Sequence, residues 1–338
     1  MKRALNTACI IMVALLAACG QQIPLLRDSG HLSGSHAADA LKSDVELDLE
    51  LDKVPFFPQH EYQCGPAALA SVLQYCGVLV SVESLVDKVY LPDKRGSLQY
   101  ELLATVRRSG LIPYILDGQL TSLLAELSSG RPVLVLQNLG LDSYPVWHYA
   151  VVIGFDLKND RLILRSGTER RKLMSARHFV KTWSKADNWG FVVLKPGDFP
   201  SEVDRDRYLT AITALEGIVS EATQLLAFRA AVERWPRNAW ALTGLANAFY
   251  ASGDSLRAEQ TFRRLLRIDP EHTIARNNLA QLLQERGCDR AARNEVERAL
   301  AELDEDDVLY GQVMETMAEI EGKGEIGKAV ECAELRFK

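Results

Sequence analysis

Cys64 combines the residue type and the local sequence of a thiol nucleophile. It follows the polar residues 59–63 and precedes Gly65 and Pro66, after which apolar side chains recur at helical spacing. Proline suits the first turn of a helix, because the N–H that it lacks would have no partner there. A cysteine at that point lies at the positive end of the helix dipole, which favours the thiolate. We therefore expect Cys64 to begin a helix as an acidic thiol, with Gly65 leaving the nearby backbone open to a substrate carbonyl.

A thiol nucleophile also needs a base that holds its proton, and His148 is the best candidate. It opens the β-rich run 147–155, where a strand start lets its side chain face the Cys64 helix. Without such a partner, Cys64 would be interpreted as a small buried residue at a helix start. The other histidines lie in the N-terminal segment, a loop, a predicted helix and a repeat region, and they are His31, His36, His60, His178 and His272.

The elements around these two residues predict an α+β domain over residues 53–198. Helical runs come first: Gly77 can end the Cys64 helix, Ser81 and Ser97 are expected N-caps of two more helices, and residues 119–127 form a fourth. β-rich runs then follow at 133–136, 149–155, 161–164 and 191–194, with a hairpin turn at 157–160 and a helix at 175–186 over the sheet. Helices followed by an antiparallel sheet indicate the α+β class.

Two blocks of this region resemble the papain-like peptidases that process bacteriocin leader peptides, and stand-alone relatives of that domain. The first block is Gln59 with Gln63-Cys64-Gly65-Pro66-Ala67, and the second is His148-Tyr149-Ala150-Val151-Val152-Ile153-Gly154. The resemblance covers about residues 54–196. It implies that Cys64 is the nucleophile and that His148 is the general base and then the general acid. It also implies that Gln59 donates to the oxyanion beside the backbone N–H of Cys64.

The sequence departs from that family in two places. Gln59 lies five residues before Cys64 where the family has six, so the loop must be one residue tighter, and Gln59 has the alternative role of capping a turn. The family's aspartate on the strand after the histidine is absent, and Ser166 occupies the matching position. A hydroxyl can accept from the imidazole but adds no negative charge, which Cys–His pairs tolerate better than Ser–His pairs. Glu169 would substitute if the strand curls, and loss of activity is the remaining alternative.

Residues 204–303 are almost wholly helical and repeat every 34 positions. Pairs at this interval are Phe228/Phe262, Pro236/Pro270, Leu245/Leu279, Ala246/Ala280, Gly253/Gly287 and Ala258/Ala292. The pattern resembles tetratricopeptide repeats, with Ala246 and Ala258 where paired helices touch, Phe262 in the groove and Pro270 ending the second helix. An unrelated array of helical hairpins is the alternative. The Pro- and Gly-rich run 195–200 separates this region from the α+β domain, and residues 304–338 are expected to supply a capping helix.

Residues 1–19 have the pattern of an export signal. Lys2 and Arg3 precede the apolar run 8–18, which is too short to span a bilayer. It ends in Leu16-Ala17-Ala18-Cys19-Gly20, which resembles the lipobox of bacterial lipoproteins and implies cleavage before Cys19 and its acylation. No aspartate follows Cys19, which implies anchoring at the outer membrane on the periplasmic side. Residues 20–52 would then be a linker, although 44–52 alternate acidic and apolar residues and are either an edge strand or an extended acidic segment. An ordinary signal peptide with a chance cysteine is the alternative.

Composition and cysteine spacing exclude several other classes. The net charge is −6 with no block of Lys or Arg, so no nucleic-acid partner is expected. No Cys/His cluster has zinc-ligand spacing, and we expect neither a metal nor another cofactor. Cys64 and Cys76 are twelve residues apart on one predicted helix, about 18 Å, which is too far for a disulfide. Whether Cys288 pairs with Cys332 is left open by the sequence.

The sequence therefore predicts a lipid-anchored periplasmic cysteine peptidase that hydrolyses a peptide or protein substrate, with a repeat domain that recruits a protein partner. The resembling family acts on leader peptides that end in paired glycines, usually when fused to a transporter. No transporter is recognised in this sequence, so that specificity is not carried over. One alternative is a catalytically silent papain-like scaffold in an envelope complex, whose Cys64 would not react readily with iodoacetamide. The other is a transglutaminase-like acyltransferase, which would incorporate amines without net hydrolysis.

Overall fold

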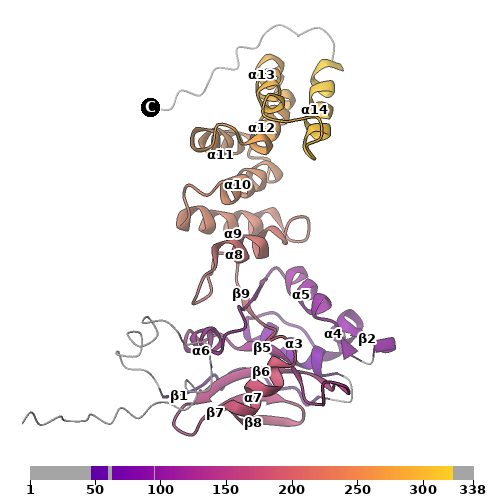
Figure 1. The fold of residues 1–338 in the computed structure, drawn as a ribbon, viewed down its shortest axis with the longest axis vertical. Helices are drawn as coiled ribbons and strands as arrows, with labels where there is room; N and C mark the ends of the chain where they lie inside the picture. The colour runs from indigo at the N-terminus through magenta and orange to yellow at the C-terminus, as the bar shows by residue number, and fades with distance from the viewer. Residues whose placement is uncertain (1–46, 60–62, 95, 323–338) are drawn as a thin grey trace, which may run out of the picture.

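The computed structural model describes residues 47–59, 63–94 and 96–322. Two parts follow one another along the chain: a mixed α/β part built on one large sheet, and a stack of helices that extends from it (Figure 1). The predicted signal, the lipobox with Cys19 and the start of the linker lie outside the described residues, as does Cys332. Cys288 is disulfide-bonded, while Cys64 and Cys76 are free.

One antiparallel sheet is the framework of the first part. Its main strands run in the spatial order β4, β9, β5, β6, β7, β8, and the hairpin predicted at residues 157–160 joins β6 to β7. The strands are β4 (Ile112–Ile115), β5 (Val133–Asn138), β6 (Trp147–Asp156), β7 (Arg161–Ser166), β8 (Glu169–Ser175) and β9 (Gly190–Leu194). A short strand β1 (Asp48–Glu50) pairs with the end of β6, with Leu49 opposite Phe155. Residues 48–50 therefore follow the edge-strand alternative.

The two faces of the sheet carry different helices. Tyr149, Val151 and Ile153 of β6 pack against one set, and Ala150 and Val152 pack against the other, as period-two alternation requires. The first set is α3 (Cys64–Tyr75), α4 (Val82–Val89) and α5 (Gln99–Arg108), and the second is α6 (Leu120–Ser128) and α7 (Ala176–Ser184). The α+β class predicted from the sequence is confirmed.

Most helix boundaries follow from local signals, but one predicted cap is wrong. Ser81 accepts from the N–H of Ser84 at the start of α4, and Gly77 follows α3 with φ 92°. Ser97 does not cap α5, whose N-cap is Leu98. It lies instead on β3 (Gly96–Ser97), which forms a two-stranded hairpin with β2 (Tyr90–Leu91) around the 3-10 helix η1 (Pro92–Lys94). The predicted helix exists, but Ser97 before it is part of this small hairpin and does not cap the helix.

The sequence does not predict β4 and β8, and both lie at the edges of the main path. β4 contains Pro113, which lacks the N–H of a central strand residue and is tolerated at an edge. β8 begins with exposed charged residues, Glu169 to Arg171, rather than with an alternating apolar pattern. Charged side chains protect an open edge from pairing with another chain. Edge strands therefore lack the signal that identified the central ones.

The second part consists of antiparallel helices stacked in sequence (Figure 1). They are α8 (Arg205–Thr213), α9 (Glu221–Arg234), α10 (Ala239–Ala251), α11 (Ser255–Ile268), α12 (Thr273–Glu285), α13 (Asp289–Leu300) and α14 (Tyr310–Gly322). Ala246, Ala258 and Phe262 are buried between them, as the repeat pattern predicts. Gly244 lies against Phe228 so closely that an added Cβ would overlap the ring. α14 packs on α12 and α13 and covers the end of the stack.

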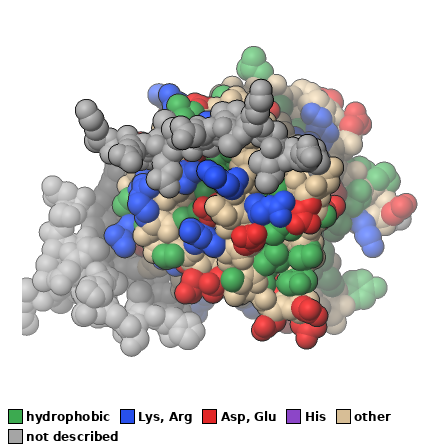
Figure 2. Space-filling model, turned by 90° about the horizontal axis from the view of Figure 1, so that it is seen from above, with side chains coloured by type: hydrophobic (Ala, Val, Ile, Leu, Met, Phe, Trp, Pro, Cys, Tyr) green, Lys and Arg blue, Asp and Glu red, His purple; other side chains and the backbone are tan. Residues whose placement is uncertain are grey.

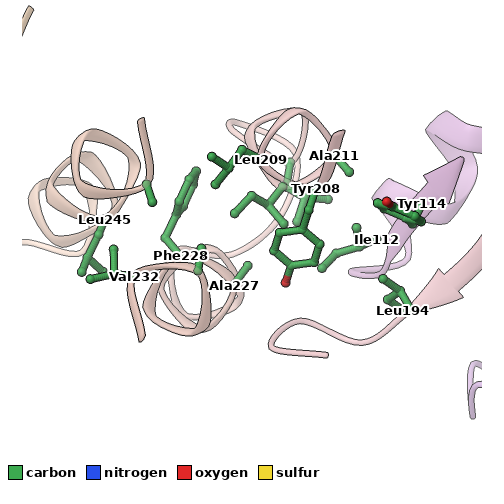
Figure 3. Packing of buried hydrophobic residues seen from close by; sticks show 14 of the residues in the cluster. Ile112, Tyr114, Leu194, Tyr208, Leu209, Ala211, Ala227, Phe228, Val232 and Leu245 are labelled. Carbon is green, nitrogen blue, oxygen red and sulfur yellow. The ribbon is translucent and has the colours of Figure 1, made fainter. Parts of the chain in front are cut away.

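The two parts share a continuous apolar core at their junction (Figure 3). Ile112 and Tyr114 of β4 lie on the side of Tyr208 of α8, while Leu209 of α8 points towards Phe228, which continues the cluster into the repeats. The Tyr208 hydroxyl donates to the carbonyl of Asp198, and the Tyr114 hydroxyl accepts from the N–H of Asp204. The Pro- and Gly-rich run 195–200 thus leads into a packed joint.

The free end of the repeat stack carries charges of both signs. Figure 2 shows basic, acidic and apolar side chains interspersed on this face, without one large region of a single charge. Some charged side chains form ion pairs between neighbouring helices, such as Arg293 of α13 with Glu321 of α14 at 3.1 Å. Within residues 47–59, 63–94 and 96–322, no helix has the length and apolar character needed to cross a bilayer.

Candidate active site

Cys64 is the first residue of α3, as the sequence predicts. Pro66 lies in the first turn, and the residues from Gly65 to Leu73 are buried against the sheet. Gln63 is the N-cap residue but makes no capping hydrogen bond through its side chain. The packing of α3 across β6 therefore brings the sulfur to the end of that strand where His148 lies.

A groove of about 920 Å³ opens at this point. Cys64, His148 and Gln59 all line it, together with Gly167 and residues of the β2–β3 hairpin. The structure thus brings together three residues that come from α3, β6 and the segment before α3. Among the described residues, no hydrogen bond joins the Cys64 thiol to the His148 ring. The two side chains therefore line the same groove without being bonded to each other.

Ser166 holds the His148 ring from behind. Its Oγ lies 2.9 Å from His148 Nε2, and its side chain is buried in the sheet. Because this hydrogen bond engages Nε2, Nδ1 is the ring nitrogen left to exchange a proton with a thiol. Glu169, the alternative third residue, instead forms an ion pair with Lys172 at 3.3 Å on the exposed strand β8.

Gln59 is held by three hydrogen bonds. Its Nε2 donates to the carbonyl of Tyr149 at 3.3 Å, and its Oε1 accepts from the N–H of Gly167 at 2.9 Å. Its backbone N–H donates to the carbonyl of Gly167 at 3.0 Å. A primary amide has two N–H groups, so one remains for another acceptor.

The protonation states differ from the sequence-based expectation of an acidic thiol. Burial raises the pKa of Cys64, and the backbone N–H groups of Tyr149 and Gly65 offset only part of that rise. Burial and the nearby charge of Lys172 lower the pKa of His148 to about 4. Desolvation therefore outweighs the helix start, and near pH 7 the two groups rest as a neutral thiol and a neutral imidazole.

Gly65 also has a different role from the one expected. It is buried beneath Ser97, and a Cβ at Gly65 would overlap that side chain. Gly65 therefore makes room for the β2–β3 hairpin rather than for a substrate carbonyl. The Ser97 hydroxyl is buried without a hydrogen-bond partner at the edge of the groove, and the Ser97 carbonyl accepts from the Tyr149 hydroxyl at 3.1 Å.

Sequence reasoning did not identify Ser97, Lys172 or the backbone of Tyr149 as parts of this site. Tyr149 was recognised only as a member of a strand motif, yet its carbonyl accepts from Gln59 and its backbone N–H acts to lower the pKa of Cys64. Lys172 lies on an edge strand with no distinctive pattern, and Ser97 resembles an ordinary helix cap. A strand assignment for β8 would have placed Lys172 beside β7 and near Ser166.

Comparison with protein families identifies both parts of the chain. Residues 51–190 match the Peptidase_C39 like family, and residues 225–273 and 243–308 match the tetratricopeptide repeat family. The chain therefore contains a Peptidase_C39-like domain followed by tetratricopeptide repeats, which confirms the two resemblances found in the sequence. No curated protein matches the chain.

Solved structures resemble each part. A putative C39-like peptidase from Bacillus anthracis shares 18% identity, covering 44% of this chain and 98% of its own, with a TM-score of 0.37. The peptidase domain of Streptococcus ComA, a bifunctional ABC transporter, shares 21% identity over 42% of this chain and 98% of its own, with a TM-score of 0.35. The Yersinia enterocolitica type III secretion translocator chaperone SycD shares 13% identity over 36% of this chain and 86% of its own, with a TM-score of 0.33.

Proposed function

We propose that this protein is a cysteine peptidase in which Cys64 attacks a peptide carbonyl with His148 as its base. The observation that carries the proposal is the shared groove, where the first residue of α3 and an imidazole fixed by Ser166 face the same space. A nucleophile, a base and a group that orients the base are the three parts that thiol catalysis requires. The Peptidase_C39-like domain supports this reaction class.

The neutral resting pair determines the order of proton movements. As Sγ bonds to the substrate carbonyl carbon, its proton passes to Nδ1 of His148, and Ser166 accepts from Nε2–H. The backbone N–H of Cys64 and the remaining N–H of Gln59 would stabilise the oxyanion. His148 then protonates the leaving amine, the C–N bond breaks and a thioester remains on Cys64.

Water completes the reaction. His148 takes a proton from water as the oxygen attacks the thioester carbonyl. Collapse of the tetrahedral intermediate breaks the C–S bond and releases a carboxylic acid, and the imidazolium returns its proton to the sulfur. The net change is hydrolysis of one peptide bond, with the protein restored.

The substrate would be a peptide or protein, and the repeats would recruit a protein partner. Repeat stacks of this kind present an extended surface to peptides or proteins, and the packed joint fixes that surface to the peptidase part. Acylation of Cys19 would hold the protein at the outer membrane on its periplasmic side. A Cys19→Ser variant should then leave the membrane fraction, while an unchanged distribution would contradict the anchor.

A mixture of peptides derived from envelope proteins tests the peptidase proposal. The purified wild-type protein should generate new peptide termini detectable by mass spectrometry, and Cys64→Ala should generate none. Cys76→Ala is the matched control, because Cys76 is free, lies outside the groove and donates a hydrogen bond to the carbonyl of Val193. Equal products from wild type and Cys64→Ala would contradict the proposal.

A catalytically silent scaffold is the second candidate, and two observations favour it. Ser166 supplies no negative charge beside His148, and burial raises the pKa of the Cys64 thiol. A scaffold would bind peptides in the same groove without forming a thioester. Detection of a peptide captured by wild type and Cys64→Ala alike, with no cleavage by either, would support the scaffold over the peptidase.

A further inference from the structure

The ladder between β6 and β7 stops short of its geometric end. After a register shift between Gly154 and Val152, the two strands pair as far as Val151 with Arg165. Continuing the same antiparallel register would place Tyr149 opposite Gly167, and those two residues would exchange backbone hydrogen bonds as a closed rung. They do not pair with each other, so four backbone groups at this level need other partners.

Gln59 satisfies three of those four groups. Its carboxamide bridges the two strands, donating to the Tyr149 carbonyl and accepting from the Gly167 N–H. Its own N–H donates to the Gly167 carbonyl. Backbone polar groups that lose their partners away from water destabilise a fold, so this replacement is what lets the strands remain apart.

The fourth group, the Tyr149 N–H, has no partner on β7. Tyr149 and Cys64 line the same groove, and this N–H acts to lower the pKa of the Cys64 thiol. An N–H directed at a thiol favours its charged form over the neutral one. If Tyr149 and Gly167 closed the rung, this N–H would bond to Gly167 and be lost to the sulfur. The open rung also sets the spacing of the neighbouring residues, since Tyr149 follows His148 and Gly167 follows Ser166.

We propose that Gln59 is a positioning residue that holds β6 and β7 apart, so that the Tyr149 N–H stays free of Gly167 on the Cys64 groove and His148 stays aligned with Ser166. This inference rests on the proposed function for the roles of Cys64 and His148. It assigns Gln59 an action in the free protein, before any substrate is bound. A residue that only donates to an oxyanion has no acceptor at that stage.

The test is the pH dependence of Cys64 alkylation by iodoacetamide in the substrate-free protein. Gln59→Met keeps the length of the side chain but removes both side-chain hydrogen bonds. Gln99→Met is the matched control, because Gln99 lines the same groove and makes no side-chain hydrogen bond in the described structure. We expect the alkylation profile of Gln59→Met to move to higher pH, with about a tenfold lower rate near pH 7, and that of Gln99→Met to coincide with wild type.

A Gln59→Met profile identical to wild type would overturn the proposal and leave Gln59 as a donor to the substrate alone. If Gln59→Met fails to fold, hydrogen exchange of wild type decides: the Gly167 amide should be protected through its bond to Gln59, and rapid exchange would overturn the inference. Neither measurement uses a substrate. A shifted profile in a protein that cleaves no peptide would therefore remove the peptidase function and leave the positioning role intact.

Discussion

Ser166 places a neutral hydroxyl 2.9 Å from His148 Nε2, at the position where the family resemblance of the sequence implies an aspartate. A hydroxyl fixes the orientation of the ring but does little to stabilise an imidazolium. Burial and Lys172 already favour the neutral ring. His148 is therefore a weak base, because its partner Ser166 carries no negative charge.

Ser166→Asp should strengthen that base. A carboxylate beside Nε2 raises the pKa of His148 by stabilising its charged form, and we expect the peptidase rate near pH 7 to rise about tenfold. Ser166→Ala should lower it, because the ring loses its orienting partner. Rates measured on one cleaved peptide check both variants, and a lower rate for Ser166→Asp in a folded protein would contradict the assignment.

His148 also makes stability depend on pH. Its pKa is about 4 in the folded protein and about 6.5 in an unfolded chain, so between these values the unfolded state binds the proton more readily. The stability that the neutral His148 ring contributes to the folded protein is fully present above about pH 6.5 and is lost as the pH falls towards 4. Relative to His148→Gln, wild type should lose up to about 3 kcal/mol over that range. Urea unfolding of both proteins at several pH values measures it, and parallel curves would contradict the assignment.

At this scale the sequence identified residues better than it identified their environment. Cys64 and His148 stand at element starts next to recognisable motifs, so their types and positions were predictable. The direction of the Cys64 pKa was predicted wrongly, because burial against the sheet is invisible in the helix-start pattern. The contacts of Gln59 depend on where two strands diverge, which no local sequence signal reports.

Among the elements, helices were predicted more accurately than strands. Ser81 is the cap that the sequence predicted, and it accepts the N–H of Ser84. Ser175, the first residue of the predicted helix 175–186, caps α7 by accepting the N–H of His178. Central strands such as β5 are recognisable by their continuous apolar residues. β4 and β8 are not, since proline and charged side chains protect the edges of the sheet. The Ser97 error has the same origin, because the short β2–β3 hairpin lacks a pattern of its own.

The contact between α9 and α10 offers a clean test of repeat packing. Gly244→Ala would place a Cβ within the Phe228 ring, so we expect a loss of about 1–3 kcal/mol in unfolding free energy. Gly311→Ala is the control, because a Cβ in α14 meets no atom within 4 Å and alanine favours the helix by up to about 1 kcal/mol. Thermal unfolding of both variants compares them, and equal stabilities would show that the Phe228 contact is unimportant.

At the scale of the whole molecule, the two parts share a buried core, which the Pro- and Gly-rich run 195–200 did not indicate. Proline and glycine at 195–200 predicted where the α+β domain ends, and the 34-residue interval predicted the helical repeats beyond it. Neither of these patterns predicts that Tyr208 and Tyr114 are buried in one shared core. That outcome depends on β4, an edge strand that the sequence did not identify.

Tyr208→Ala should weaken this joint. Tyr208 is fully buried and its hydroxyl holds the Asp198 carbonyl, so its removal should cost about 3–5 kcal/mol. We expect calorimetry to resolve two unfolding transitions in the variant where wild type has one. Tyr100→Ala is the control, since Tyr100 is 79% exposed, makes no side-chain hydrogen bond among the described residues, and a surface substitution changes stability by about 0.5 kcal/mol or less. A single unshifted transition in Tyr208→Ala would contradict a shared core.

The central claim is that His148 serves as the base for Cys64, and alkylation of the full protein with iodoacetamide near pH 7 tests it most directly. Mass spectrometry can follow Cys64 and Cys76 in the same sample, and Cys76, whose pKa burial raises to about 11, is the internal reference. The account predicts that His148→Gln slows labelling of Cys64 by about tenfold or more and leaves labelling of Cys76 unchanged. Equal labelling of Cys64 in wild type and His148→Gln would contradict it.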